Sequence, residues 1–170
     1  MKNILIVPDS LLRKKSIPLA KVTNQEIDIS NKMIEIMKNA PGVGLAAIQI
    51  GIMKQIVTVR IKKDAESKEK IYSLFNPVIT SYSKKKIIME EGCLSIPLQF
   101  AEIERPEIIK VKYINEKNQI IEETKDGIES RILQHEIDHL SGILFIDYLS
   151  NLKKNMIIKK VIKLKKIGKI

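Results

Sequence analysis

The sequence has few aromatic residues, no tryptophan and a single cysteine. Aromatic side chains make up only 4% of its 170 residues, so the core must be built mainly of isoleucine, leucine, valine and methionine. A lone cysteine, Cys93, cannot form an internal disulfide bond. Such a cysteine is most often a small buried apolar residue, and only unusual neighbours in the sequence would indicate another role.

Long apolar runs are also missing. The N-terminal apolar stretch at 4–7 ends at Pro8-Asp9 and is too short for the core of a signal peptide. No run approaches the roughly 18 apolar residues of a membrane-spanning helix. We therefore expect a soluble, cytoplasmic protein with no membrane partner. Apolar residues make up 44% of the chain, which is enough for one packed domain, or one domain with a short appendage.

Acidic residues are absent after Asp147. The net charge is +10, but the first 150 residues, with 22 basic and 20 acidic side chains, carry only +2, and residues 151–170 carry eight lysines. We therefore expect a nearly neutral body at 1–150 and a basic C-terminal helix at 151–170 appended to the same domain. A negatively charged partner, if there is one, should meet this helix.

Local patterns predict an α+β fold with mostly antiparallel strands. A helix is expected at 24–39, another from the N-cap Asp126 to Leu140 with Gly142 just past its end, and a third from Ser150 to about Lys166. Strands are expected at 55–60, 71–75, 86–89, 108–114 and 119–123, with a charged loop at 62–70 and a hairpin turn at 115–118.

The strongest local signal is the run His135-Glu136-Ile137-Asp138-His139, on the second predicted helix. Histidines at i and i+4 lie on one face of a helix, so two imidazole nitrogens can reach one metal ion. A glutamate beside the first histidine can move the proton of an activated water. These are the only two histidines in the chain. The alternative is two structural histidines on an ordinary helix.

A catalytic metal site needs a third protein ligand and an open position. One protease class supplies a third histidine shortly after the motif, but Phe145 occupies that position here. Another class supplies a downstream carboxylate, and none follows Asp147. The third ligand must therefore come from upstream, where Cys93, between Gly92 and Pro97, is the softest remaining donor. One cysteine with two histidines suits Zn²⁺ by donor chemistry alone.

The segment Gly42–Gln49 is rich in glycine and alanine, so other groups can approach its backbone closely. Gln49 ends it with a neutral amide donor suited to a developing oxyanion. The segment is not a phosphate-binding loop, because the Gly-Lys-Ser/Thr ending is missing. Taken alone it is a weak signal, since small-residue runs usually serve packing.

Three motifs in this order resemble the peptide deformylase family. They are Gly-x-Gly-Leu-Ala-Ala-x-Gln at Gly42–Gln49, Glu-Gly-Cys-Leu-Ser at Glu91–Ser95 and Gln-His-Glu-x-Asp-His at Gln134–His139. The resemblance extends from Pro8-Asp9 into the last helix. It implies a deformylase-like catalytic domain at 1–150, with antiparallel strands around a central metal-bearing helix. It also implies an enzyme that removes the N-formyl group from the N-terminal methionine of newly made polypeptides and releases formate.

The resemblance also implies roles for individual residues. One divalent metal, Fe²⁺ in the cell and replaceable by Ni²⁺, Co²⁺ or Zn²⁺, would be held by Cys93, His135 and His139. Glu136 would take a proton from the attacking water and give one to the departing amine. Gln49 and the backbone N–H of Leu94 would meet the oxyanion. The methionine pocket would be lined by Val43, Gly44, Met89, Ile128 and Ile132, and an ion pair of Glu91 with Arg105 would support the ligands from behind.

The lysine-rich helix is open to two interpretations. Ile157, Val161 and Leu164 form an apolar stripe, which favours a docked helix with a solvated lysine face. The alternative is contact with ribosomal RNA near the polypeptide exit, in keeping with a nascent-chain substrate. A structural Zn²⁺ site in a basic RNA-binding domain is the non-enzymatic alternative, but such a site would need a fourth ligand. We expect no DNA partner.

Overall fold

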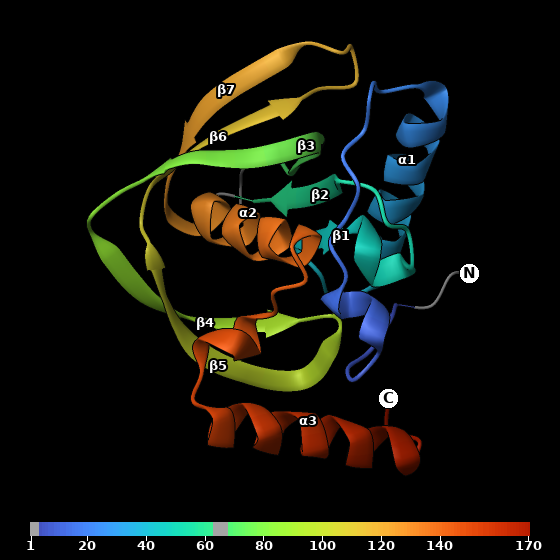
Figure 1. Ribbon diagram of the computed structural model, residues 1–170, viewed down its shortest axis with the longest axis vertical. Helices are drawn as coiled ribbons and strands as arrows, with labels where there is room; N and C mark the ends of the chain where they lie inside the picture. The colour runs from blue at the N-terminus through green and yellow to red at the C-terminus, as the bar shows by residue number, and fades with distance from the viewer. Residues whose placement is uncertain (1–3, 63–67) are drawn as a thin grey trace.

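The computed structural model describes residues 4–62 and 68–170. A five-stranded sheet and a two-stranded hairpin enclose one helix (Figure 1). The sheet has the order β1 (Gly44–Ala46), β2 (Ile56–Ile61), β3 (Lys70–Tyr82), β6 (Ile109–Ile114) and β7 (Ile120–Lys125). The hairpin consists of β4 (Lys86–Cys93) and β5 (Ile96–Pro106). Helix α2 (Gly127–Leu140) lies between sheet and hairpin, so both can supply groups to one site.

All strand pairs within the two sheets are antiparallel, and the only parallel pairing among the described residues is an isolated bridge between Ile17 and Lys54. The predicted fold class, α+β with mostly antiparallel strands, is therefore confirmed. The predicted turn at 115–118 joins β6 to β7, and Asn118 there takes a positive φ of 57°, a conformation that asparagine tolerates better than most residues.

The helices follow their sequence signals closely. Helix α1 (Asn24–Asn39) begins after Thr23, which forms a capping box with Glu26. Asp126 occupies the N-cap position of α2 as expected, but its side chain makes no capping hydrogen bond. Gly142, with φ of 72°, follows the end of α2, and its N–H donates to the carbonyl of His139 at 3.1 Å.

The strands were predicted less completely. The segments expected at 71–75 and 86–89 are parts of the longer strands β3 and β4, and both β1 and β5 were missed. Along β5 the buried side alternates regularly, but two of its members are the polar residues Gln99 and Arg105, which hide the apolar alternation. Of the loop expected at 62–70, residues 63–67 lie outside the described residues, and Lys70 belongs to β3.

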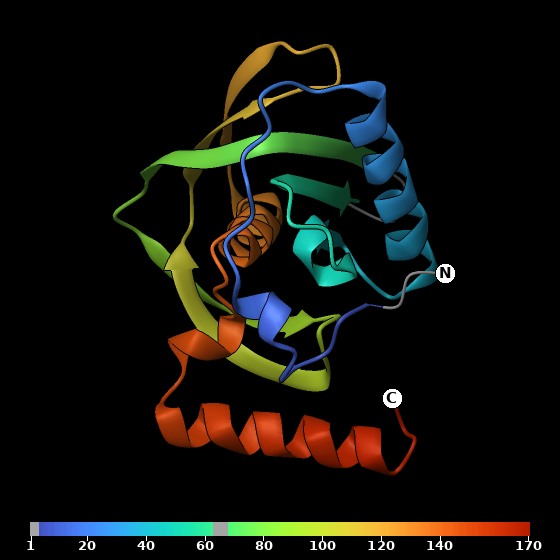
Figure 2. The same ribbon diagram turned by 45° about the vertical axis from the view of Figure 1, so that its right-hand side comes forward.

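Helix α3 (Asn151–Lys166) lies along the outside of the hairpin, on the far side from α2, in both views (Figures 1 and 2). Ser150 caps its start by accepting a hydrogen bond from the Lys153 N–H at 3.4 Å. Ile157 and Val161 join a core cluster with Ile103 of β5 and Phe145 of the 3₁₀ helix η3 (Phe145–Tyr148). No described helix is long and apolar enough to cross a membrane.

Candidate metal and active site

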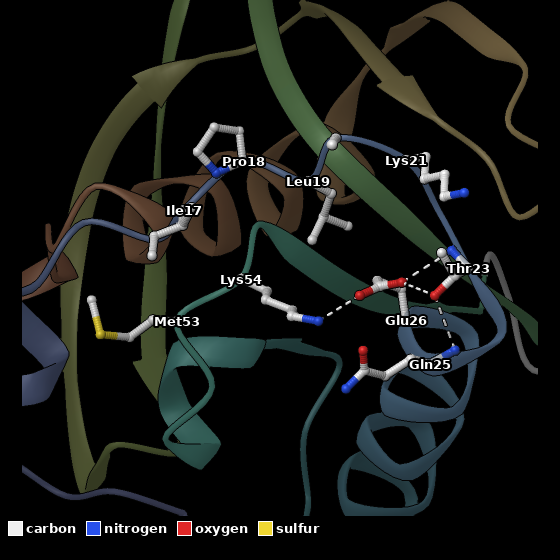
Figure 3. Close-up of a pocket in the computed structure, with 10 residues that line it drawn as sticks. Ile17, Pro18, Leu19, Lys21, Thr23, Gln25, Glu26, Met53 and Lys54 are labelled. Atoms are coloured by element: carbon white, nitrogen blue, oxygen red, sulfur yellow. Dashed lines mark hydrogen bonds and ion pairs between the residues drawn. The ribbon is translucent and has the colours of Figure 1, made fainter.

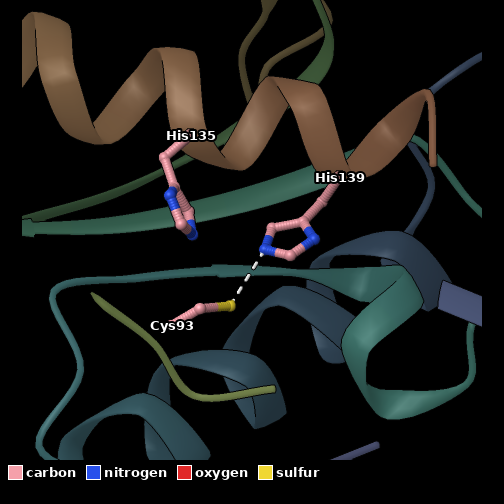
Figure 4. Close-up of side chains that lie close together, drawn as sticks. All are labelled: Cys93, His135 and His139. Carbon is pink, nitrogen blue, oxygen red and sulfur yellow. Dashed lines mark hydrogen bonds between the residues drawn. The ribbon is translucent and has the colours of Figure 1, made fainter. Parts of the chain in front are cut away.

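Helix α2 and strand β4 bring three metal-binding side chains together (Figure 4). His135 and His139 point from one face of the helix toward Cys93, the last residue of β4. Their ligand atoms all lie within 4.8 Å of one another, and Cys93 Sγ is 3.3 Å from His139 Nε2. Nδ1 of His135 lies 3.0 Å from Glu91, which leaves its Nε2 available for a metal.

This donor set fits one divalent transition-metal ion. A thiol and two imidazoles are the ligands that such ions prefer, and three protein ligands leave a coordination position open. Burial lowers the pKa of His139 well below its usual value, and the charges of His135 and Arg105 act in the same direction. A neutral imidazole is the form that binds a metal, and His139 takes this form. Burial opposes the charged form of His135 too, but hydrogen bonds with Cys93 and Glu91 outweigh it and raise the pKa of His135 well above its usual value, so a metal bound there would displace a proton.

The Glu136 carboxyl group lies against the same site. Its Oε2 atom is buried and has no hydrogen-bond partner among the described residues. Burial is the main cause that raises the pKa of Glu136 to about 7, and the charge of Glu91 adds to this effect, whereas the charge of His135 opposes it. A carboxyl group with a pKa near neutrality can both accept and donate a proton.

Gly44 makes room for Glu136. A Cβ atom placed on Gly44 would lie 2.7 Å from Glu136 Cγ, closer than real side chains pack. This close approach explains why the small-residue run holds glycine here. Strand β1 thus presses its backbone directly against the buried carboxylate.

Gln49 is held in a fixed orientation. It belongs to the 3₁₀ helix η2 (Ala47–Ile50), and its Oε1 atom accepts a hydrogen bond from the Ala46 N–H at 2.8 Å. Its Nε2 atom donates to Ser95 Oγ at 3.1 Å and lies 3.5 Å from Cys93 Sγ. Because the carbonyl is occupied by the backbone, the NH₂ group faces the metal ligands.

A cavity of about 400 Å³ opens onto these groups. Its walls include Val43, Gly44, Gln49, Cys93, Leu94, His135 and Glu136, together with the exposed apolar side chains Leu98 and Phe100. An adjoining cavity of about 290 Å³ shares Pro41, Gly42 and Val43 and is lined further by Ile128 and Ile132. Met89 lines neither of these two cavities, although it lies on β4 near the site.

Behind the ligands lies a buried charge cluster centred on Glu91. The Arg105 guanidinium donates to both Glu91 oxygens, at 2.6 and 3.0 Å, and also to Asp138 at 2.7 Å. Burial alone would raise the pKa of Glu91, but hydrogen bonds from His135 and Arg105 outweigh it and bring the pKa to about 2. Glu91 is therefore a permanent carboxylate that accepts from His135.

Comparisons with known proteins agree with this geometry. A family model described as polypeptide deformylase matches residues 1–155. The chain belongs to the peptide deformylase family. A peptide deformylase of Pelagibacter ubique is 48% identical over 97% of this chain and 95% of its own length. The crystal structure of peptide deformylase from Ehrlichia chaffeensis superposes with a TM-score of 0.94 at 35% identity, covering 99% of this chain and 98% of that one.

Family membership fixes the reaction. Peptide deformylases are metal-dependent hydrolases that remove the N-formyl group from the N-terminal methionine of newly made polypeptides, and this chain is such a deformylase. The cluster of Cys93, His135 and His139 is the group that can bind a metal among the described residues. The expectations of a deformylase and of a metal-dependent enzyme are therefore confirmed.

Sequence reasoning missed one buried charge of this deformylase. Arg131, on α2, donates to Glu91 Oε1 at 2.9 Å, and its side chain is only 4% exposed. It stands four residues before His135 and so shares its helix face. That spacing was the available signal, but an arginine on a helix more often faces solvent than a buried carboxylate.

A separate cavity of about 350 Å³ in the deformylase lies between the extended segment at 17–21 and the start of α1 (Figure 3). The Lys54 ammonium group reaches Glu26 across it at 2.5 Å. None of its lining residues lines the cavity at the metal ligands. It therefore plays no part in the site described above.

Proposed function

We propose that Cys93, His135 and His139 hold the metal ion of this deformylase. The observation that carries the proposal is the convergence of three donor atoms within 4.8 Å, two of which belong to Cys93 and His135 in the wall of an open cavity. A divalent ion held there would polarise the formyl carbonyl and lower the pKa of a water molecule. We further propose Fe²⁺ as the metal in the cell, with Ni²⁺, Co²⁺ or Zn²⁺ able to replace it.

Glu136 is the proposed proton carrier. Its carboxylate accepts a proton from the water that attacks the formyl carbon and then gives a proton to the departing amine nitrogen. Two features support this role: the unpartnered Oε2 atom and the pKa of about 7. Both steps require the carboxyl group to change its protonation state near neutral pH.

The negative charge that develops on the formyl oxygen is met by two donors. The proposed donors are the Gln49 NH₂ group and the Leu94 backbone N–H. Gln49 is supported by its fixed orientation, because an amide that is already aligned pays no reorganisation cost during the reaction. Leu94 follows Cys93 directly in the turn of the β4–β5 hairpin and lines the same cavity.

The methionine side chain of the substrate is proposed to bind among Val43, Gly44, Met89, Ile128 and Ile132. Val43 supports this assignment because it lines both the cavity at the ligands and the adjoining one, which Ile128 and Ile132 also line. A substrate whose formyl group reaches the metal ligands could therefore extend its side chain past Val43. Glu91 and Arg105 are proposed to hold His135 from behind.

The decisive experiment is formate release from a formyl-Met tripeptide by protein prepared without oxygen and loaded with Fe²⁺ or Ni²⁺. Cys93→Ser is the matched variant, because it keeps the size of the side chain and removes the thiolate. We expect formate from the parent protein and none from the variant, together with loss of the bound metal. An active variant with full metal content would remove Cys93 from the ligand set.

We also propose that α3 contacts the ribosome in the cytoplasm, and that residues 1–150 form the catalytic domain to which this helix is appended. The outward face of α3 carries exposed lysines and no acidic residue. Deleting α3 would remove Ile157 and Val161 from the core, so the better test replaces Lys159, Lys163 and Lys166 by glutamine. We expect weaker cosedimentation with ribosomes at low salt and unchanged tripeptide turnover. Unchanged cosedimentation would contradict the proposal.

A further inference from the structure

Arg131 makes hydrogen bonds to three residues of the β4–β5 hairpin. Its Nη1 atom donates to Glu91 Oε1 and to the Ile103 carbonyl, both at 2.9 Å, and its Nη2 atom donates to the Ile87 carbonyl at 2.6 Å. Arg131 belongs to α2, Ile87 and Glu91 to β4, and Ile103 to β5. One guanidinium group therefore ties the helix to both strands of the hairpin.

This connection matters because the metal donors are divided between the same elements. His135 and His139 lie on α2, whereas Cys93 lies at the end of β4. Any shift of the helix along the hairpin would change the distances between thiol and imidazoles. Arg105 makes a second connection, from β5 to Glu91 and to Asp138 of α2. The two arginines thus join the hairpin to α2 at positions 131 and 138, on either side of His135.

Charge balance gives Arg131 a second role. Glu91, Asp138 and Arg105 alone would sum to one uncompensated negative charge in the buried cluster, whose Glu91 and Arg105 side chains are 4% and 3% exposed. Arg131 neutralises this charge. A buried carboxylate that loses one of its partners is held less firmly in place, and Glu91 is the group that orients His135 through Nδ1.

We propose that Arg131 is a positioning residue of the metal centre, which fixes Glu91, and through it His135, while holding α2 against the β4–β5 hairpin. The inference rests on the ligand set proposed above. Arg131 itself touches neither the donor atoms nor the cavity that opens onto them. Residues that orient a metal-bound histidine from behind typically change metal affinity roughly 10- to 100-fold when replaced.

The test measures the affinity of oxygen-free protein for Co²⁺ by competition with a chelator, and records the visible absorption of the Co²⁺–thiolate centre. The variants are Arg131→Met, which removes the charge, and Arg131→Lys, which keeps the charge but lacks the planar fork. We expect Arg131→Met to bind Co²⁺ roughly 10- to 100-fold more weakly and with an altered absorption spectrum. Arg131→Lys should bind with intermediate affinity.

Lys125→Met is the matched control. Lys125 is also a buried cation next to α2, 7% exposed, and it pairs with Glu123 and Glu129 instead of the cluster at Glu91. We expect this variant to lose thermal stability but to keep the parent affinity and spectrum. If the role of Arg131 were purely structural, Arg131→Met would also lose thermal stability and keep the parent Co²⁺ affinity and spectrum. That outcome would overturn the proposal. Parent-like Co²⁺ binding by Arg131→Lys together with Arg131→Met would also overturn it.

Failure of the ligand set gives a different pattern. Cys93→Ser is measured beside the other variants, and we expect it to lose the thiolate absorption. If the parent protein shows no such absorption, or if Cys93→Ser retains it, the ligand set is wrong and the role of Arg131 falls with it. If Cys93→Ser behaves as expected and Arg131→Met matches the parent, the ligand set stands and only the inference about Arg131 is overturned.

Discussion

Helices α2 and α3 use their polar residues in opposite ways. In α2 the buried residues include Arg131, Gln134, His135, Glu136 and His139, whereas in α3 they are only Ile157 and Val161. The lysines of α3 other than Lys154, which pairs with Asp147, are exposed and stay hydrated, so burying the apolar stripe of this helix requires no desolvation of their charges. The polar face of α2 is withdrawn from water, which is tolerable only because most of its groups have hydrogen-bond partners.

This difference shows where function resides. A helix that buries charge is less stable than one that buries leucine, so the arrangement of α2 is explained by chemistry and not by packing. Glu136 is the clearest case, since its Oε2 atom lacks a partner among the described residues and its pKa is raised. Helix α3 shows no such cost. The contrast predicts that substitutions in α2 act on turnover and substitutions in α3 on stability.

The largest effect is expected for Glu136→Gln in α2. The amide keeps the size of the side chain but cannot carry a proton, and general acid–base catalysis typically contributes about 10²–10⁴-fold. We expect turnover of a formyl-Met tripeptide to fall by roughly that factor, with one metal still bound per chain. The measurement combines formate release with metal analysis. Substantial residual turnover at full metal occupancy would take the proton-transfer role away from Glu136.

Gly44→Ala should have the next largest effect. The added methyl group would clash with Glu136 at both Oε1 and Cγ, so the carboxylate must move away from its position beside Cys93 and His135. A displacement of about 1 Å can cost on the order of 100-fold in rate. Initial rates of formate release would measure the loss. Gly127→Ala serves as the comparison, because a Cβ there meets no atom within 4 Å, although its φ of 53° adds strain. Equal activity of both variants and the parent would contradict the close approach.

Substitutions in α3 should lower stability and leave the reaction intact. Ile157→Ala removes a buried side chain from the cluster beneath β5, and we expect a loss of about 2–4 kcal/mol in the free energy of unfolding. Lys160→Ala, on the exposed side, should change it by less than about 0.5 kcal/mol. Urea unfolding followed by circular dichroism gives both values. A large change in kcat for either variant would contradict the prediction that substitutions in α3 act on stability and not on turnover.

The smallest effect is a pH dependence of the metal-free protein. The pKa of Glu136 is about 7 in the folded protein and has its ordinary value of 4.5 in the unfolded chain. At pH values between these two, the carboxyl group is therefore protonated in the folded state and ionised in the unfolded state. Stability contributed by the protonated group is therefore lost as pH rises from about 4.5 to 7 and stays level above. Glu136→Gln should lack this slope. Parallel stability curves for parent and variant across that window would contradict the raised pKa.

The sequence predicted those features of the fold that depend on neighbouring residues. The apolar spacing of the helix at 24–39, the glycine after α2 and the hydroxyl of Ser150 act within a few positions of the helices or helix ends they define. Strand β5 was missed because Gln99 and Arg105 face inward, and the partners of Arg105, Glu91 and Asp138, come from distant segments. The alternation that identifies a strand assumes an apolar buried face, whereas the buried face of β5 mixes the apolar Ala101 and Ile103 with polar residues.

The candidate site divides in the same way. The histidine pair could be predicted because residues at i and i+4 share a face of any helix. Cys93 could be predicted because the sequence offers neither a third histidine nor a downstream carboxylate. Arg131 lies on that same face, but only the folded hairpin shows that its partners are a carboxylate and two strand carbonyls. The position of Val43 at the border of two cavities likewise depends on how strand β1 meets helix α2, which no local pattern encodes.

The division of the three donors between α2 and β4 links metal loading to the completion of folding. An unfolded chain can offer the two histidines together, but Cys93 joins them only when the hairpin has packed against the helix. An ion that needs all three donors then binds the native state alone and stabilises it by mass action, by about 4 kcal/mol at a free concentration 1,000 times its Kd. With the proposed ligand set, the native fold would thus be a condition for acquiring the metal, and the bound metal would in turn protect that fold from unfolding and degradation.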